Sequence, residues 1–244
     1  MGWDEFLKLG DGRYVSDSIN KKGFDSAASK IATILYTSGT TGRPKGVPLS
    51  HANLLHQIKS LACVANPSAG SAVLSVLPIW HAYERSAEYY FFSCGCTQSY
   101  TTIKQLKNDL QRVRPIVMVT VPRLWEAVQA GFYEAVKGLS SSRQRLLRFA
   151  LSNSSAQRRA FRTVKGLQVE AVAPIEKGIA LLEALFRWPL HVIASKFLWP
   201  KVLKQLCGGR LQFPINGGGA IAPHVDSFFE ALGVELLVGY GLTE

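Results

Sequence analysis

The stretch Tyr36-Thr37-Ser38-Gly39-Thr40-Thr41-Gly42-Arg43-Pro44-Lys45-Gly46-Val47 decides how the rest of the chain is interpreted. It holds four hydroxyl side chains, three glycines and a lysine. Glycines let the backbone turn and present neighbouring N–H groups to one concavity, while hydroxyls and a lysine add donors and positive charge for phosphate oxygens. We therefore predict a polyphosphate-binding loop formed by Thr37, Ser38, Gly39, Thr40, Thr41, Gly42 and Lys45.

The order of residues in this loop differs from that of a Walker loop, in which a glycine and four further residues precede Gly-Lys-Ser/Thr. Here Pro44 precedes Lys45, and Gly46 follows it. The apolar and largely β-branched residues 31–36 predict a buried strand before the loop. Residues 50–58 predict a helix after it, with Ser50 as the N-cap.

The remaining pattern predicts an α/β fold. Short apolar runs predict further strands at 72–77, 95–100, 116–121, 211–215 and 233–238. Segments with helical character follow them, at 86–93, at 103–113, from 122 onward and at 224–232. Because strands alternate with helices, we expect a mostly parallel sheet that is flanked by helices on both faces.

Two aromatic residues and a histidine, Trp80, His81 and Tyr83, follow the expected strand at 72–77. Open α/β sheets bind ligands beyond the carboxyl ends of their strands, which favours a binding role for this segment. A histidine at the end of an apolar strand can equally be a hydrogen-bonded core residue. The sequence leaves both interpretations open.

Two glycine-rich segments follow the last two expected strands. The triple glycine of Asn216-Gly217-Gly218-Gly219-Ala220 permits the flat approach of a ring to the backbone, although a flexible turn has the same composition. The chain then reaches Gly239-Tyr240-Gly241-Leu242-Thr243-Glu244. In this segment Tyr240 offers a stacking face, Thr243 a hydroxyl, and Glu244 a hard oxygen ligand suited to Mg²⁺.

These segments resemble, in order, the motifs of the adenylate-forming superfamily of acyl-CoA synthetases, luciferases and peptide-synthetase adenylation domains. The loop at 36–47 resembles its phosphate loop, Leu77-Pro78-Ile79-Trp80-His81 its second core motif, and 216–220 and 239–244 its adenine-binding and Gly-Tyr-Gly-x-Thr-Glu motifs. The continuation to Arg85 is similar to the long-chain fatty acid branch. Over most of residues 30–244, the resemblance is closest to plant plastid acyl-acyl-carrier-protein synthetases.

The resemblance implies roles for individual residues. The loop from Thr37 to Lys45 would wrap the phosphates of ATP, and Thr37 and Glu244 would bind Mg²⁺. The adenine would lie against Gly217, Gly218, Gly219, Ala220, Tyr240 and Gly241, with Thr243 at the α-phosphate. His81 would position the fatty acid carboxylate, and Trp80 and Tyr83 would lie near the acyl pocket. His81, Lys45 and Thr243 are thus the expected catalytic residues.

The same resemblance implies the reaction and its partners. A fatty acid carboxylate attacks the α-phosphate of ATP to give an acyl-adenylate and pyrophosphate, and a thiol of acyl carrier protein or of CoA then takes the acyl group. A plastid location is implied as well. A non-catalytic remnant that binds nucleotide or acyl groups is the alternative.

Not every motif of the superfamily is found. The sequence has no Thr-Gly-Asp for the ribose hydroxyls and no Gly-Lys-rich segment with the adenylation lysine. We therefore expect a fragment: a polar lead-in at 1–30 and a partial adenylation domain at 31–244, part of the family's large N-terminal domain, without the C-terminal domain. Such a chain alone is not expected to complete the reaction.

Composition adds further bounds. A chain of 244 residues that is 47% hydrophobic can bury one large core or two small ones. It has no uninterrupted apolar run of 18 residues, which predicts no membrane-spanning helix, and its N-terminus resembles neither a signal nor a transit peptide. The four cysteines lack the spacing of a zinc site, so we expect reduced thiols in an intracellular compartment.

The positive charge is concentrated in one region. Residues 104–210 hold 19 Lys/Arg and 6 Asp/Glu, whereas the rest of the chain holds 9 and 11. Since no nucleic-acid-binding motif accompanies this charge, we expect no nucleic acid partner. An acidic carrier protein and an anionic membrane surface both suit it.

Within this region, residues 138–207 are expected to form a helical basic insertion without strands. Its apolar stretch at 179–200 includes Trp188 and Trp199. One interpretation is a helical hairpin that packs on its own domain, because amphipathic stripes usually face a core. The other is a helix in a membrane interface, since apolar residues with tryptophan and basic flanks suit that position. We expect peripheral membrane contact in which both tryptophans take part.

Overall fold

The computed structural model describes residues 27–38, 43–168 and 171–243. The chain divides into two compact units, residues 1–56 and residues 57–244. Part of the expected loop, Gly39–Gly42, lies outside the described residues, as do Glu244 and most of the expected lead-in at 1–30.

The first unit contains a two-stranded antiparallel hairpin of β1 (Ile31–Ser38) and β2 (Pro44–Ser50). The helix α3 (His51–Leu61) follows β2 directly. The backbone N–H of Asn53 donates to Ser50 Oγ at 3.2 Å, and the N–H of Ser50 donates to Asn53 Oδ1 at 2.9 Å. These reciprocal bonds satisfy donors at the helix start and confirm Ser50 as the N-cap.

The strand predicted at 31–36 is present as β1, but the prediction that it is buried is wrong. In β1 the side chains of Ile31, Ile34 and Tyr36 are exposed, and Leu35 is buried opposite Val47. The strand β2, with which β1 forms its two-stranded sheet, was not predicted from the sequence. Among the described residues of this hairpin, Leu35 and Val47 form the buried cross-strand pair.

The second unit is built on a five-stranded parallel sheet in the order β4-β3-β5-β6-β7, which confirms the α/β fold. The strands are β3 (Ala72–Ser75), β4 (Thr97–Tyr100), β5 (Val117–Thr120), β6 (Phe213–Asn216) and β7 (Leu237–Val238). β6 pairs with β5 although residues 121–212 separate them in sequence. Since all five strands run the same way, their carboxyl ends meet at one edge of the sheet.

Helices cover this sheet through three apolar clusters. The helices that follow its strands are α4 (Ala82–Ser93), α5 (Leu106–Val113), α6 (Pro122–Lys137) and α10 (Pro223–Leu232). Aromatic rings join α6 to α10: the ring centroids of Trp125 and Phe229 are 4.9 Å apart, and those of Phe132 and Phe228 are 5.1 Å apart. This contact forms the centre of the largest core cluster.

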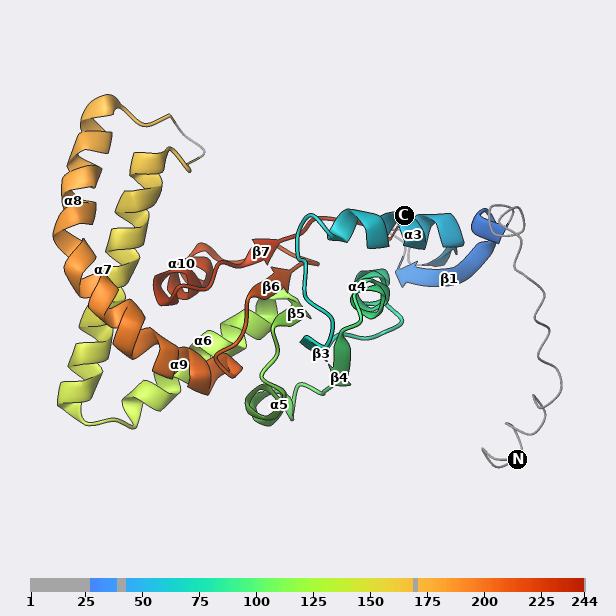
Figure 1. The fold of residues 1–244 in the computed structure, drawn as a ribbon, viewed down its shortest axis with the longest axis horizontal. Coiled ribbons are helices and arrows are strands. Elements are labelled where there is room, and N and C mark those ends of the chain that lie inside the picture. Colours follow the sequence, from blue (N-terminus) through green and yellow to red (C-terminus); the bar gives the residue numbers. More distant parts are fainter. Residues whose placement is uncertain (1–26, 39–42, 169–170, 244) are drawn as a thin grey trace. The chain divides into compact units, whose positions relative to one another are not determined.

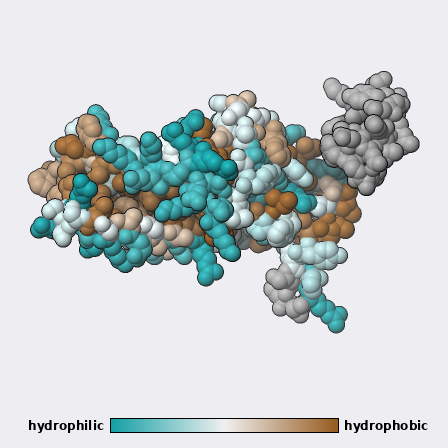
Figure 2. Space-filling view, turned by 90° about the horizontal axis from the view of Figure 1, so that it is seen from below, coloured by the Kyte–Doolittle hydropathy of each residue, from teal (hydrophilic) through white to brown (hydrophobic). Residues whose placement is uncertain are grey.

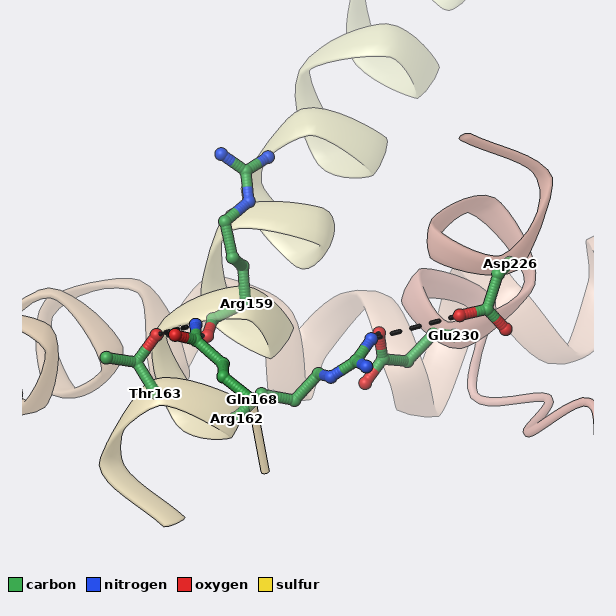
Figure 3. Close-up of polar contacts among 6 residues, drawn as sticks. All are labelled: Arg159, Arg162, Thr163, Gln168, Asp226 and Glu230. Carbon is green, nitrogen blue, oxygen red and sulfur yellow. Dashed lines mark hydrogen bonds and ion pairs between the residues drawn. The ribbon is translucent and has the colours of Figure 1, made fainter. Parts of the chain in front are cut away.

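The expected helical insertion lies between α6 and β6. It comprises α7 (Ser141–Lys165), α8 (Pro174–Ile193), a π-helical turn η1 (Ala194–Leu198) and α9 (Trp199–Cys207). α7 and α8 lie side by side, and α7 also contacts α10 (Figure 1). Arg162 of α7 forms ion pairs with two carboxylates of α10, at 3.1 Å to Glu230 and 3.8 Å to Asp226 (Figure 3).

The helical run Pro174–Cys207 differs from expectation in two respects. It is 34 residues long and apolar enough to cross a membrane by length and composition. No such helix was predicted, because the sequence has no uninterrupted apolar run of 18 residues. Trp199 is buried and Trp188 is exposed, so the expectation of membrane contact is wrong for Trp199. Trp199 is held inside because its Nε1–H donates to Ser154 Oγ of α7 at 3.1 Å.

Candidate functional site

The carboxyl ends of β3, β5, β6 and β7 bring three of the motif segments to one edge of the sheet. Thr120 ends β5 and lies beside Asn216, which ends β6. The backbone N–H of Gly217 donates to Thr120 O at 3.0 Å, and that of Gly239 donates to Asn216 O at 2.8 Å. The polar and glycine-rich residues after each strand are therefore neighbours, as ligand sites of open α/β sheets require.

Tyr83 lies directly against the triple glycine. A Cβ atom added to Gly217 would stand 2.7 Å from Tyr83 Cζ and 2.9 Å from its hydroxyl oxygen. Burial, followed by the neighbouring Glu84 carboxylate, raises the pKa of the Tyr83 hydroxyl. The sequence indicated that these glycines permit a ring to approach the backbone, and in this structure the ring of Tyr83 lies close to Gly217.

Gly218 requires glycine for a second reason. Its φ is +73°, a left-handed conformation that residues with a Cβ rarely adopt. Gly219 has no such constraint, because its nearest neighbour would be Pro122 Cγ at an ordinary 3.5 Å. The segment 217–219 is therefore a shaped turn after β6, closed on one side by the ring of Tyr83.

His81 is exposed and forms the N-cap of α4. Its Nδ1 accepts a hydrogen bond from the backbone N–H of Tyr83 at 3.4 Å, which leaves Nε2 directed away from the cap. This exposure excludes the buried-core interpretation of His81. Trp80, beside it, is 71% exposed, so both side chains are accessible at the end of β3.

Asn216 is a polar residue of this edge that the sequence analysis did not select. Its side chain is fully buried, and neither Oδ1 nor Nδ2 has a hydrogen-bond partner among the residues that the structure describes. A buried amide without partners costs free energy and fits an additional polar group that would bond to it. The signal in the sequence was its position between the strand expected at 211–215 and the triple glycine.

Buried carboxyl groups of α4 form a second polar feature that the sequence did not reveal. Glu84 is 2% exposed, and burial raises its pKa to about 7, against the lowering effect of a hydrogen bond from Ser75. Gln98 Nε2 donates to Ser75 Oγ at 2.7 Å, and the Tyr100 hydroxyl donates to Glu88, one turn after Glu84. This cluster joins α4 to β3 and β4.

The segment after β7 is open. Tyr240 is 94% exposed, Gly241 is exposed, and Thr243 is half-buried. Glu244, the expected Mg²⁺ ligand, lies outside the described residues. The ring of Tyr240 is thus accessible for stacking, in keeping with the role that the sequence suggested.

In the first unit, the described ends of the expected phosphate loop lie opposite each other. Thr37 of β1 pairs with Lys45 of β2, and Ser38 with Pro44. The hairpin therefore brings a hydroxyl and an ammonium group to the two sides of the loop. Within the parts of the chain that the structure describes, no group of three His, Cys, Asp or Glu side chains could hold a metal ion.

The family follows from a comparison with known proteins. Residues 8–244 match the model of the AMP-binding enzyme family. The chain belongs to the AMP-binding enzymes.

Individual relatives of this AMP-binding chain are plant acyl-activating enzymes. It is 42% identical over 222 residues to a probable chloroplastic acyl-activating enzyme 16 of Arabidopsis thaliana, covering 88% of the chain and 30% of that protein. It is 42% identical over 221 residues to a chloroplastic long-chain-fatty-acid–[acyl-carrier-protein] ligase of the same plant, at 87% and 30% coverage. Long chain acyl-CoA synthetase 4 of that plant is 32% identical over 251 residues, at 99% and 33%. The chain thus spans about a third of these relatives' length.

Solved structures support the AMP-binding fold. The adenylation domain of a carboxylate reductase from Mycobacterium chelonae matches with a TM-score of 0.53 at 22% identity, covering 89% of the chain and 27% of that domain. The N-terminal domain of FACL13 from Mycobacterium tuberculosis matches with a TM-score of 0.53 at 16% identity, covering all of the chain and 43% of that domain. At these identities the likeness concerns the fold alone.

Proposed function

We propose that the chain is part of an ATP-dependent long-chain fatty acid ligase, which forms an acyl-adenylate and passes the acyl group to a thiol. The main support is that segments 77–83, 216–220 and 239–243 follow β3, β6 and β7 of one parallel sheet, in which β5 lies between β3 and β6, and so come to one sheet edge. A binding site of this kind is expected there in an open α/β sheet. One relative at 42% identity is named a long-chain-fatty-acid–[acyl-carrier-protein] ligase, and a relative at 32% is named a long chain acyl-CoA synthetase.

The proposed roles follow the polar, aromatic and glycine residues of that edge. Tyr240 would stack on adenine, the turn Gly217–Ala220 would take the ring's edge, and Thr243 would contact the α-phosphate. Asn216 offers a buried amide whose atoms have no partner among the described residues, a suitable contact for a polar group of the acyl-adenylate. His81 would hold the fatty acid carboxylate through Nε2, with Trp80 and Tyr83 beside the acyl chain.

The β1–β2 loop is the proposed phosphate-binding element. Lys45 and Thr37, opposite each other in the hairpin, would contact phosphate oxygens by charge and by hydrogen bond. Mg²⁺ would accompany ATP, with Thr37 and Glu244 as its proposed ligands. Its chemistry would be to neutralise phosphate charge while the carboxylate attacks.

For the acceptor we propose the thiol of an acyl carrier protein, with CoA as the second candidate. The carrier-protein ligase is 42% identical to this chain, whereas the acyl-CoA synthetase is 32% identical. The named relatives at 42% identity are chloroplastic, so a plastid is the proposed location. A non-catalytic binding remnant is the alternative function.

The test is fatty-acid-dependent exchange of pyrophosphate into ATP by the complete natural polypeptide that contains these residues. We expect exchange with long-chain acids. In K45A the exchange rate should fall by about a hundredfold or more, because the positive charge that would stabilise the phosphates during the reaction is removed. Unchanged exchange in K45A would contradict the assignment of the loop. Binding of ATP without exchange would favour the remnant, and comparing carrier protein with CoA as acceptor decides between the thiols.

A further inference from the structure

Small and polar residues form the contact between helices α7 and α8. The residues that α8 buries are Ala180, Ala184 and His191. The first two form an apolar cluster with Ala160 and Val164 of α7. A helix pair in a water-soluble domain normally buries its large apolar side chains, so this contact is unusual.

Polar side chains bond across the same contact. Asn153 Nδ2 of α7 donates to the backbone carbonyl of Arg187 at 3.2 Å. Ser154 Oγ lies 3.0 Å from His191 Nδ1 and accepts from Trp199 at 3.1 Å. Small residues with polar side chains between them are typical of helix contacts in lipid, where packing and hydrogen bonds replace the hydrophobic effect.

The large apolar residues of the α8–η1 run form an exposed stripe, which we call the apolar stripe. Its members recur at helical spacing: Ile175, Ile179, Leu182, Phe186, Ile193 and Phe197. Phe186 is 86% exposed and Leu182 is 70% exposed. At about 100° per residue, this stripe points away from Ala180 and Ala184. At the left of Figure 2, where α7 and α8 lie, brown apolar side chains gather beside hydrophilic ones.

Basic charge accompanies the apolar stripe. α7 contains seven Lys/Arg and no Asp/Glu, and η1 with α9 adds Lys196, Lys201 and Lys204. Among the described residues, the ion pairs of these helices involve only Arg162 with α10 and Arg187 with Glu183. Most of the positive charge is therefore available to an anionic partner.

We propose that α7 and the α8–η1 run form a membrane-docking element that lies in the surface of a lipid bilayer carrying anionic headgroups. The apolar stripe would enter the boundary of the acyl chains, and the basic residues would remain among the headgroups. An exposed apolar stripe with basic residues is the combination by which interfacial helices bind. This proposal concerns a surface and does not depend on the proposed ligase function.

A second copy of the chain suits the surface less well. Two copies joined through this element would bring two groups of basic helices together, and like charges oppose such a contact. Anionic lipid headgroups attract the same Lys and Arg side chains and neutralise their charge. Charge complementarity therefore favours the membrane.

The element would lie in the membrane surface rather than cross the bilayer. The run Pro174–Cys207 is long enough to span, but it contacts α7 through its alanine face. Spanning would either separate that contact or take the seven basic residues of α7 into hydrocarbon, where charged side chains are strongly disfavoured. An in-plane position keeps the contact and the charges in place.

Vesicle flotation of the whole chain tests the proposal, with mixed phosphatidylcholine–phosphatidylglycerol vesicles and with phosphatidylcholine alone. We expect binding to the anionic vesicles that salt weakens but does not abolish, because screening removes only the charge contribution. The variant L182S/F186S should lose about tenfold or more in binding, since two exposed apolar side chains no longer enter the lipid. I103S, which removes an exposed apolar residue outside the element, is the control and should bind normally.

The depth of a tryptophan placed on the apolar stripe distinguishes an in-plane helix from a spanning one. F186W in a W188F background provides this tryptophan, and subtracting the emission of W188F isolates its fluorescence. Lipids brominated near the headgroup should quench it more than lipids brominated near the chain ends. Deep quenching would overturn the in-plane arrangement. Binding that vanishes in salt and ignores L182S/F186S, or concentration-dependent dimers without vesicle binding, would overturn the membrane-docking proposal.

Discussion

The backbone of Gly217 lies so close to the ring of Tyr83 that a Cβ on the glycine would stand 2.7 Å from Tyr83 Cζ. The ring is attached to the first turn of α4, while the glycine follows β6. This contact therefore joins two motif segments that are more than a hundred residues apart in the sequence, and it fixes the distance between them.

Replacing Gly217 with alanine should destabilise the fold by roughly 1–3 kcal/mol, because the added methyl group forces the rigid ring to move. G219A is the matched control, since its Cβ would meet Pro122 at an ordinary 3.5 Å. Urea unfolding of both variants measures the difference. Adding Y83L should reduce the penalty of G217A, and an additive double variant would show that the two residues are not coupled.

Glu84 should make stability depend on pH. Its pKa is raised from 4.5 to about 7 in the folded chain, so the folded state holds a proton that the unfolded state has released in this range. Stability from this group should therefore fall as pH rises from about 4.5 to about 7.

The variant E84Q, which resembles the protonated acid, should remove that fall. At pH 8 it should be more stable than the parent by up to roughly 3 kcal/mol, with little difference at pH 4.5. The midpoints of urea unfolding between pH 4.5 and pH 8 provide the measurement. The control is E126Q, which replaces an exposed carboxylate of α6. Parallel pH profiles of E84Q and the parent would contradict the prediction.

His81 should have separable structural and functional roles. H81A removes the cap of α4 and should cost about 1 kcal/mol of stability, whereas H81N keeps a side-chain acceptor and should remain near the parent. If His81 also positions the fatty acid carboxylate, both variants should lose about a hundredfold in fatty-acid-dependent exchange. Normal exchange in the stable H81N would limit His81 to capping.

Ser154 should be important for the contact between α7 and the run that follows it. S154A leaves the Trp199 indole N–H and the His191 ring without their shared buried partner, which should cost roughly 1–3 kcal/mol. S155A, the next residue on α7, is the control and is expected to change stability little. Thermal unfolding compares the two, and equal melting temperatures would show that water replaces the hydroxyl.

The sequence by itself determined the local features of this protein. The glycines, hydroxyls and lysine at 36–47, the strands alternating with helices and the segments after the strands were all readable, because each depends on neighbouring residues. These features also indicated the family. The Ser50 cap and the helical character of 138–207 were predicted for the same reason, since capping and helical periodicity act over a few residues.

Tertiary structure decided what depends on distant partners. It placed β6 beside β5, brought Tyr83 against Gly217 and buried Asn216 and Glu84, none of which has a local signal. It also exposed Ile31 and Ile34, because β1 joins a two-stranded hairpin rather than the parallel sheet. Trp188 and Trp199 look alike in the sequence, but only Trp199 meets Ser154 of α7 and becomes buried. Burial is set by which element packs against a residue, and that choice is made by the whole fold.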